Sequence, residues 1–143
     1  MDAPLDDVIQ RYHRAADEFA RGDPEPVKAL YAHGDDVTLA NPFVGPPVRG
    51  WNQVSRALDY ASSNFRDGQM SDVETISTFL GVDLATIVEL EQWQARVGQR
   101  EDVTPFGLRV TTTFRRDGGS WKMVHRHADP MSKPNPDGPL RTS

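Results

Sequence analysis

Apolar residues near the start of the chain recur at helical spacing. In LDDVIQRYHRAADEFARGD, the members of this stripe are Val8, Tyr12, Ala15, Ala16 and Phe19. Asp6 and Asp7 suit the positive end of a helix, and Gly22 suits its exit. The pattern therefore predicts an amphipathic helix over residues 5–21.

Two further helices follow from the same kind of evidence. A short one is expected between Asp23, a good N-cap, and Gly34, which suits a C-terminal exit. A longer one is predicted over residues 52–65, where the apolar positions are Val54, Ala57, Leu58, Ala61 and Phe65.

Strand-like composition dominates after Asp72. The segments 71–81, 84–97, 106–116 and 120–128 are rich in β-branched and aromatic residues, and Gly, Asp or Pro separate them. RDGGS predicts a hairpin between the last two. A shorter strand, DVTLAN, precedes the loop PFVGPPVRG, whose prolines and glycines argue against regular pairing. This order predicts an α+β fold in which a mainly antiparallel sheet curls around the helices.

Composition narrows the function classes. The 143 residues, 37% of them hydrophobic, suit one domain with a real core. A net charge of -5 argues against nucleic acid or anionic lipid as partners. The absence of cysteine excludes thiol catalysis, cysteine-based zinc sites and disulfides. We therefore expect small molecules, or other copies of the chain, as partners.

The two ends of the chain lead to further expectations. The proline-rich segment 132–143 has little to bury, so we expect a domain over residues 1–131 and a disordered tail. No apolar run approaches the roughly 18 residues of a membrane span. The acidic start also lacks the features of a signal peptide, so a cytoplasmic location is expected.

Two segments carry a resemblance to a known family. The loop NPFVGPPVRG and the ending RVTTTFRRDGGSWKMVHRHADP resemble the nuclear transport factor 2-like superfamily. Within it they are most similar to SnoaL-like proteins, a group with polyketide cyclases, ketosteroid isomerases and the association domain of calmodulin-dependent kinase II. The resemblance covers about residues 5–130. It implies a cone-shaped curved antiparallel sheet wrapped around the N-terminal helices, an internal and mostly apolar pocket, and a homodimer formed through the sheet.

The resemblance also locates the catalytic positions of a steroid isomerase. The aspartate that serves as the base there corresponds to Asn41, and an amide does not accept a proton at neutral pH. The tyrosine of the oxyanion hole matches Ala15, about one turn from Tyr12, and the acid matches Thr112. Steroid isomerase activity is therefore not expected.

The ending HRHAD supplies other candidates for catalysis, namely His125, His127 and Asp129. In a regular strand these residues share one face with Trp121 and Met123. An aspartate beside a neutral imidazole can keep it basic for proton abstraction next to a carbonyl. Alternatively, the histidines pack in a dimer interface and Asp129 caps the turn. A metal held by the histidines with Asp129 or His13 has too few local ligands to be predicted, and no cofactor is expected.

The opposite face of this strand carries Arg126. Kinase association domains have cationic side chains in the pocket, and that analogy directs Arg126 inward, together with Arg109 and Thr111. The alternative is that both arginines pair on the surface with Glu89, Glu91 or Asp129. The remaining candidate ligand-binding residues are Tyr12, Asn41, Trp51 and Trp93. Either tryptophan could instead serve packing alone.

Three functions remain open at this point. The chain could be a cofactor-independent isomerase, cyclase or dehydratase acting on an apolar carbonyl compound, with Asn41 or an arginine stabilising an enolate. It could bind a small organic acid or other metabolite without converting it. It could also be an assembly domain whose pocket is unused.

Overall fold

The computed structural model describes residues 3–131, so the predicted tail lies outside the described residues. The helices are α1 (Ala3–Phe19), α2 (Glu25–Lys28) and α3 (Trp51–Ser63). The strands are β1 (Thr38–Ala40), β2 (Val48–Arg49), β3 (Phe65–Leu80), β4 (Leu84–Val97), β5 (Thr104–Asp117) and β6 (Ser120–Pro130). In this part of the chain, no helix combines the length and the apolar character that crossing a membrane requires.

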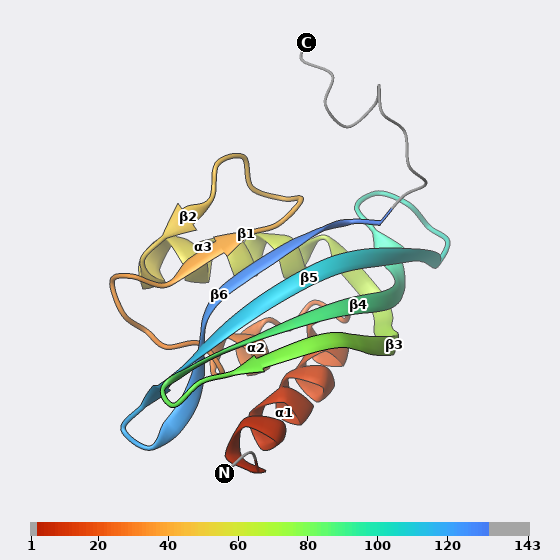
Figure 1. Cartoon of the computed structure of the whole chain (residues 1–143). Coiled ribbons are helices and arrows are strands. Elements are labelled where there is room, and N and C mark those ends of the chain that lie inside the picture. The colour runs from red at the N-terminus through yellow and green to blue at the C-terminus, as the bar shows by residue number, and fades with distance from the viewer. Residues whose placement is uncertain (1–2, 132–143) are drawn as a thin grey trace, which may run out of the picture.

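All six strands belong to one sheet, in the order β2-β1-β6-β5-β4-β3. Figure 1 shows β3 to β6 side by side as a long, bent sheet, with α1 running beneath it. The predicted α+β class with a curved sheet and N-terminal helices is confirmed. The sheet is mixed, however, because β1 pairs with β6 in parallel while the long strands pair antiparallel.

The loop after β1 differs from the expectation. Val48 and Arg49 do pair, antiparallel, with Leu39 and Thr38 of β1. The prolines lie before this two-residue strand, so they do not interrupt its hydrogen bonds.

One face of the sheet is buried against the helices. The alternation is regular along β4, where the buried residues are Ala85, Ile87, Glu89, Glu91, Trp93 and Ala95. On this inner face, Trp93 and Ala95 pack with Phe19 of α1 and Leu58 of α3 in one hydrophobic core. Two carboxylates thus point into the core with the apolar side chains.

A β-bulge in β6 changes which residues of the strand face the core. Before the bulge the odd-numbered residues face inward, and after it the even-numbered residues do. Thr113 of β5 lies opposite His125, but the next residue, Phe114, lies opposite Met123. Val124 is therefore an extra residue on β6. Met123 faces the core before it, and Arg126 does so after it. The prediction that residues 121, 123, 125, 127 and 129 share one face is wrong for this reason.

Candidate functional site

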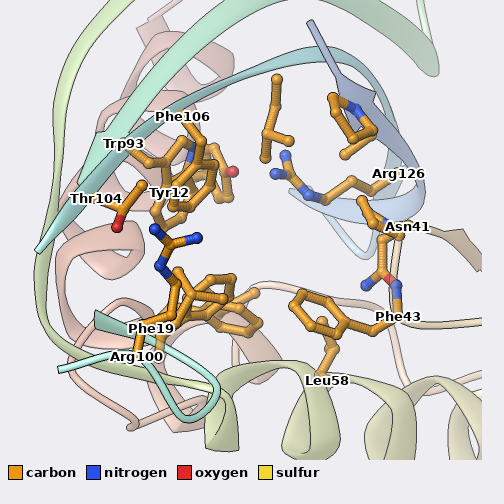
Figure 2. Close-up of a pocket in the computed structure, with 17 residues that line it drawn as sticks. Tyr12, Phe19, Asn41, Phe43, Leu58, Trp93, Arg100, Thr104, Phe106 and Arg126 are labelled. Carbon is orange, nitrogen blue, oxygen red and sulfur yellow. The ribbon is translucent and has the colours of Figure 1, made fainter. Parts of the chain in front are cut away.

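A cavity of about 330 Å³ lies between the inner face of the sheet and the helices. This volume lies at the small end of the range for small-molecule sites. Its main apolar walls are Phe19, Phe43, Leu58, Phe65, Trp93 and Phe106. The polar side chains among the described lining residues are Tyr12, Asn41, Arg100, Thr104 and Arg126 (Figure 2).

Three of the aromatic rings form a nearly parallel stack. The ring centroids of Phe65 and Phe106 are 5.7 Å apart at 11°, and those of Trp93 and Phe106 are 6.1 Å apart at 12°. Trp93 and Phe106 are register partners on β4 and β5, which fixes their positions. The wall that they build favours contact with a flat molecule.

A buried ion pair lies at the cavity wall. The guanidinium of Arg126 donates to both carboxylate oxygens of Glu91, at 3.2 Å from Nη1 and 3.0 Å from Nη2. The same carboxylate accepts from the Tyr12 hydroxyl at 2.8 Å and from Trp93 Nε1 at 2.9 Å. The glutamate is fully buried, and these four hydrogen bonds satisfy its oxygens.

The protonation states in this cluster follow from its contacts. Burial raises the pKa of Glu91, but the charge of Arg126 and the donated hydrogen bonds outweigh it and lower the pKa below 4.5. Burial raises the pKa of Tyr12 well above 10.0. Burial lowers the pKa of Arg126, and the Glu91 charge outweighs this and raises it. At neutral pH, Tyr12 and Arg126 are therefore protonated donors and Glu91 is ionised.

Asn41 presents a second donor to the cavity. It follows β1, whose Leu39 and Ala40 pair with Arg126 and His127. Its Oδ1 accepts from the backbone N–H of Phe43 at 2.9 Å, which fixes the amide orientation. Figure 2 shows its side-chain nitrogen directed into the cavity, on the same side as Arg126. Both side chains therefore present hydrogen-bond donors to the same cavity.

The candidate residues divide between the cavity and other parts of the fold. Four of them line the cavity, namely Tyr12, Asn41, Trp93 and Arg126. The others are absent from the described lining. Trp51 stacks on His33 at a centroid distance of 3.8 Å. His127 is exposed, and Thr111 is its register partner on β5.

The remaining candidates lie on the outer face, in contacts of their own. His125 Nδ1 lies 2.8 Å from the Thr38 hydroxyl. Partial burial, and then the neighbouring His127, lower the pKa of His125. Arg109 donates to both oxygens of Asp129, at 2.8 and 3.1 Å, and the two side chains are 65% and 42% exposed. The sequence left open whether Arg109 and Arg126 point into the cavity or pair on the surface. Arg109 pairs on the surface, whereas Arg126 lines the cavity.

Several residues of the site were not among the candidates. Glu91 could have been identified from VELEQWQ, because it shares a strand face with Trp93. Arg100 lies in the loop before β5 and Thr104 is the first residue of that strand, where no periodicity indicates the direction of a side chain. His13, considered above as a metal ligand, is hydrogen-bonded through Nε2 to the buried Glu89, with 3.1 Å between Nε2 and Oε2.

Comparison with known proteins identifies the family. The family model described as the SnoaL-like domain matches residues 5–132. The chain belongs to the SnoaL-like family. No curated protein matches it.

Several solved structures share the fold of this SnoaL-like chain, although their sequence identity to it is low. A nuclear transport factor 2-like superfamily protein from Salmonella enterica serovar Typhimurium is 16% identical, with a TM-score of 0.74 and 92% of each chain covered. A ketosteroid isomerase-like protein from Erwinia carotovora is 21% identical, with a TM-score of 0.71, covering 91% of this chain and 95% of its own. A protein from Streptomyces avermitilis, described as a dehydratase of the NTF2-like family, is 18% identical, with a TM-score of 0.66. The match covers 91% of this chain and 95% of that protein. At these identities the likeness shows the fold alone.

Proposed function

We propose that the cavity binds a flat, largely apolar organic molecule through a neutral oxygen acceptor, such as a ketone, without converting it chemically. The observation that carries this proposal is the pair of donors, Asn41 and Arg126, on one side of an otherwise mostly aromatic cavity. Apolar walls with a few convergent polar groups are typical of small-molecule sites.

The charge balance at Arg126 favours a neutral acceptor. Glu91 already neutralises the guanidinium through two hydrogen bonds. A carboxylate at the same place would bring a second negative charge close to Glu91. Two like charges about 4 Å apart repel by roughly 4 kcal/mol at an effective dielectric constant near 20. A carbonyl oxygen accepts from the remaining N–H groups without this cost.

The described lining of the cavity offers no side chain suited to act as a base in proton transfer. Isomerases, cyclases and dehydratases of carbonyl compounds require a base within reach of the substrate. The ionisable side chains of the described lining are Tyr12, Arg100 and Arg126. Arginine does not lose its proton in proteins, and burial keeps Tyr12 protonated by raising its pKa. His125, His127 and Asp129 would act only on a substrate at the outer face.

The acceptor site is tested with two compounds of the same shape. Isothermal titration calorimetry compares 2-acetylnaphthalene with 2-isopropenylnaphthalene, in which a CH₂ group replaces the ketone oxygen. Hydrogen bonds of this kind contribute about 1 kcal/mol each, so the two together should make the ketone bind roughly thirtyfold more tightly. Equal affinities, or no binding of either compound, would overturn the proposal.

The variant Asn41→Asp assigns the effect to the amide. The new side chain keeps an oxygen for the backbone N–H of Phe43, so the local fold is retained. It replaces the amide donor with an acceptor, so we expect the preference for the ketone to fall severalfold. Arg49→Gln, an exposed change outside the described lining, is the control and leaves the preference unchanged.

A further inference from the structure

A second polar pair, Arg100 and Thr104, lies across the cavity from Arg126 and Asn41 (Figure 2). Thr104 begins β5 opposite Ala95, which is fully buried on the inner face, so its side chain belongs to that face. Its hydroxyl is buried and has no hydrogen-bond partner in the described part of the chain. A buried hydroxyl without a partner costs free energy. A ligand group that forms a hydrogen bond with it removes this cost, which favours binding.

The position of Arg100 is fixed by its backbone. Arg66 donates to the carbonyl of Gly98 at 2.8 Å and to that of Arg100 at 2.9 Å. The N–H of Gly98 in turn donates to the carbonyl of Asn64 at 2.8 Å. These bonds tie the loop between β4 and β5 to the start of β3, so Arg100 is held at the cavity edge.

The charge of Arg100 is far less compensated than that of Arg126. Its nearest recorded acidic partner is Asp102, with 3.9 Å between Nε and Oδ1. Both side chains are mostly exposed, at 64% and 76%, so this contact is weak. Arg126, by contrast, donates twice to a buried carboxylate. An anionic group is therefore favoured at Arg100 and disfavoured at Arg126.

The strand register limits the separation of the two polar ends. Glu91, which holds the Arg126 guanidinium, lies opposite Leu108 of β5. Thr104 is four residues before Leu108, which is at most roughly 13 Å along a strand. Two fused rings with a substituent at each end are of this length, and the Phe65, Trp93 and Phe106 rings lie along the cavity wall.

We infer that the cavity takes an elongated aromatic oxo acid. Its keto oxygen accepts from Asn41 and Arg126, and its carboxylate binds Arg100 and the Thr104 hydroxyl. The keto end rests on the function proposed above, whereas the carboxylate end is an additional site.

The additional site is tested with 6-acetyl-2-naphthoic acid and 6-acetyl-2-naphthamide, which differ in charge and hardly in shape. Calorimetry at low ionic strength should show that the acid binds about tenfold more tightly, since a charge-assisted hydrogen bond is stronger than a neutral one. Equal binding of the acid and the amide would overturn the inference.

Two variants locate the effect. Arg100→Gln should abolish the preference for the acid, and Thr104→Val should reduce it by removing only the hydroxyl. Arg49→Gln removes an arginine charge elsewhere on the surface and should preserve the preference. If Arg100→Gln keeps the full preference, the inference is wrong.

The same titrations separate the two proposals. 2-Acetylnaphthalene has no carboxylate, so its affinity should be the same in Arg100→Gln and in the unaltered protein. If it binds normally while acid and amide bind alike, only the carboxylate site fails. If it does not bind at all, the proposed function fails, and the oxo acid fails with it.

Discussion

Arg126 and Glu91 form a bidentate ion pair on the inner face of the sheet. Of the two residues, Arg126 lines the cavity. The carboxylate is fully buried, and its other contacts are the Tyr12 hydroxyl and the Trp93 indole N–H. A fully buried ion pair contributes little net stability, but its partners depend on each other. It holds the guanidinium in place for a ligand.

Loss of the guanidinium should therefore be costly. Arg126→Met leaves Glu91 buried without its counter-charge, and we expect the free energy of unfolding to fall by about 3–5 kcal/mol. The double variant Arg126→Met/Glu91→Gln removes both charges and keeps an acceptor for Tyr12, so it should recover most of the loss. Urea denaturation at neutral pH measures both. A single variant as stable as the unaltered protein would contradict the interpretation.

The acid stability of the protein should depend on Glu91. Burial alone raises the pKa of this carboxyl, but Arg126 and the donors outweigh it and lower the pKa below 4.5. A carboxyl with a lowered folded-state pKa stabilises the fold above its unfolded pKa. This contribution is lost as the pH falls from about 4.5 through the folded value.

The matched variant isolates this effect. In Glu91→Gln, the part of the stability that depends on this carboxyl should be missing, so the curve of unfolding free energy against pH should be flatter below about 4.5. Urea denaturation between pH 7 and pH 3 makes the comparison. Curves of identical shape would rule out Glu91 as the responsible group.

The histidines of β6 should be dispensable for ligand binding. His125 contacts Thr38, and His127 is exposed on the face opposite to Arg126. We expect His125→Ala/His127→Ala to bind 2-acetylnaphthalene within about twofold of the unaltered protein, because neither histidine lines the cavity. Deuterium exchange next to the ketone, followed by NMR, provides the functional check. Exchange accelerated by the unaltered protein and lost in this variant would establish the enzyme hypothesis instead.

Helix α1 and strand β4 were predictable because their apolar periods are clear. Strand β3 was predicted too short, because its first residue, Phe65, was assigned to the preceding helix. Val8 to Phe19 follow a helical stripe, and 84–97 alternates as a strand with one buried face. The α+β class follows from their order. Val48 and Arg49 were missed because nearby prolines hid a two-residue pairing with β1.

The site was predictable only in part. One extra residue, Val124, reverses the faces of His125 and Arg126, and no residue type in MVHRHAD requires a bulge there. Arg126 and Asn41 were identified as candidates through the resemblance to the family, because each matches a position that lies in the pocket of related proteins. Arg100 depends on how a loop folds back, which no local pattern encodes.

Gly68 marks a close approach between α1 and the sheet. Its N–H donates to the carbonyl of Ala20, and a Cβ here would lie 2.5 Å from the Gln94 carbonyl oxygen. Gly68→Ala should therefore destabilise the protein by about 1–3 kcal/mol through overpacking. Gly45→Ala is the control, since a Cβ there meets no atom within 4 Å. Thermal unfolding of both variants is the measurement, and equal midpoints would contradict the packing argument.

We also propose that the outer face of the sheet forms a homodimer interface. Val88 and Leu90 lie on β4 between the buried residues, so they point away from the core, and Thr111 is the register partner of Val88. Apolar and uncharged residues at the centre of a face are typical of an interface core. Light scattering should therefore give about twice the chain mass of 16.0 kDa.

Charge repulsion tests this interface. In a twofold dimer a new charge near the axis faces its own copy, so Val88→Arg should convert the dimer into a species of 16.0 kDa. Val82→Arg is the control on the β3–β4 turn, where Val82 is 82% exposed. If Val82→Arg dissociates the dimer and Val88→Arg does not, the copies meet through the hairpin that also exposes Phe79 and Leu84. A monomer before any substitution would refute both arrangements.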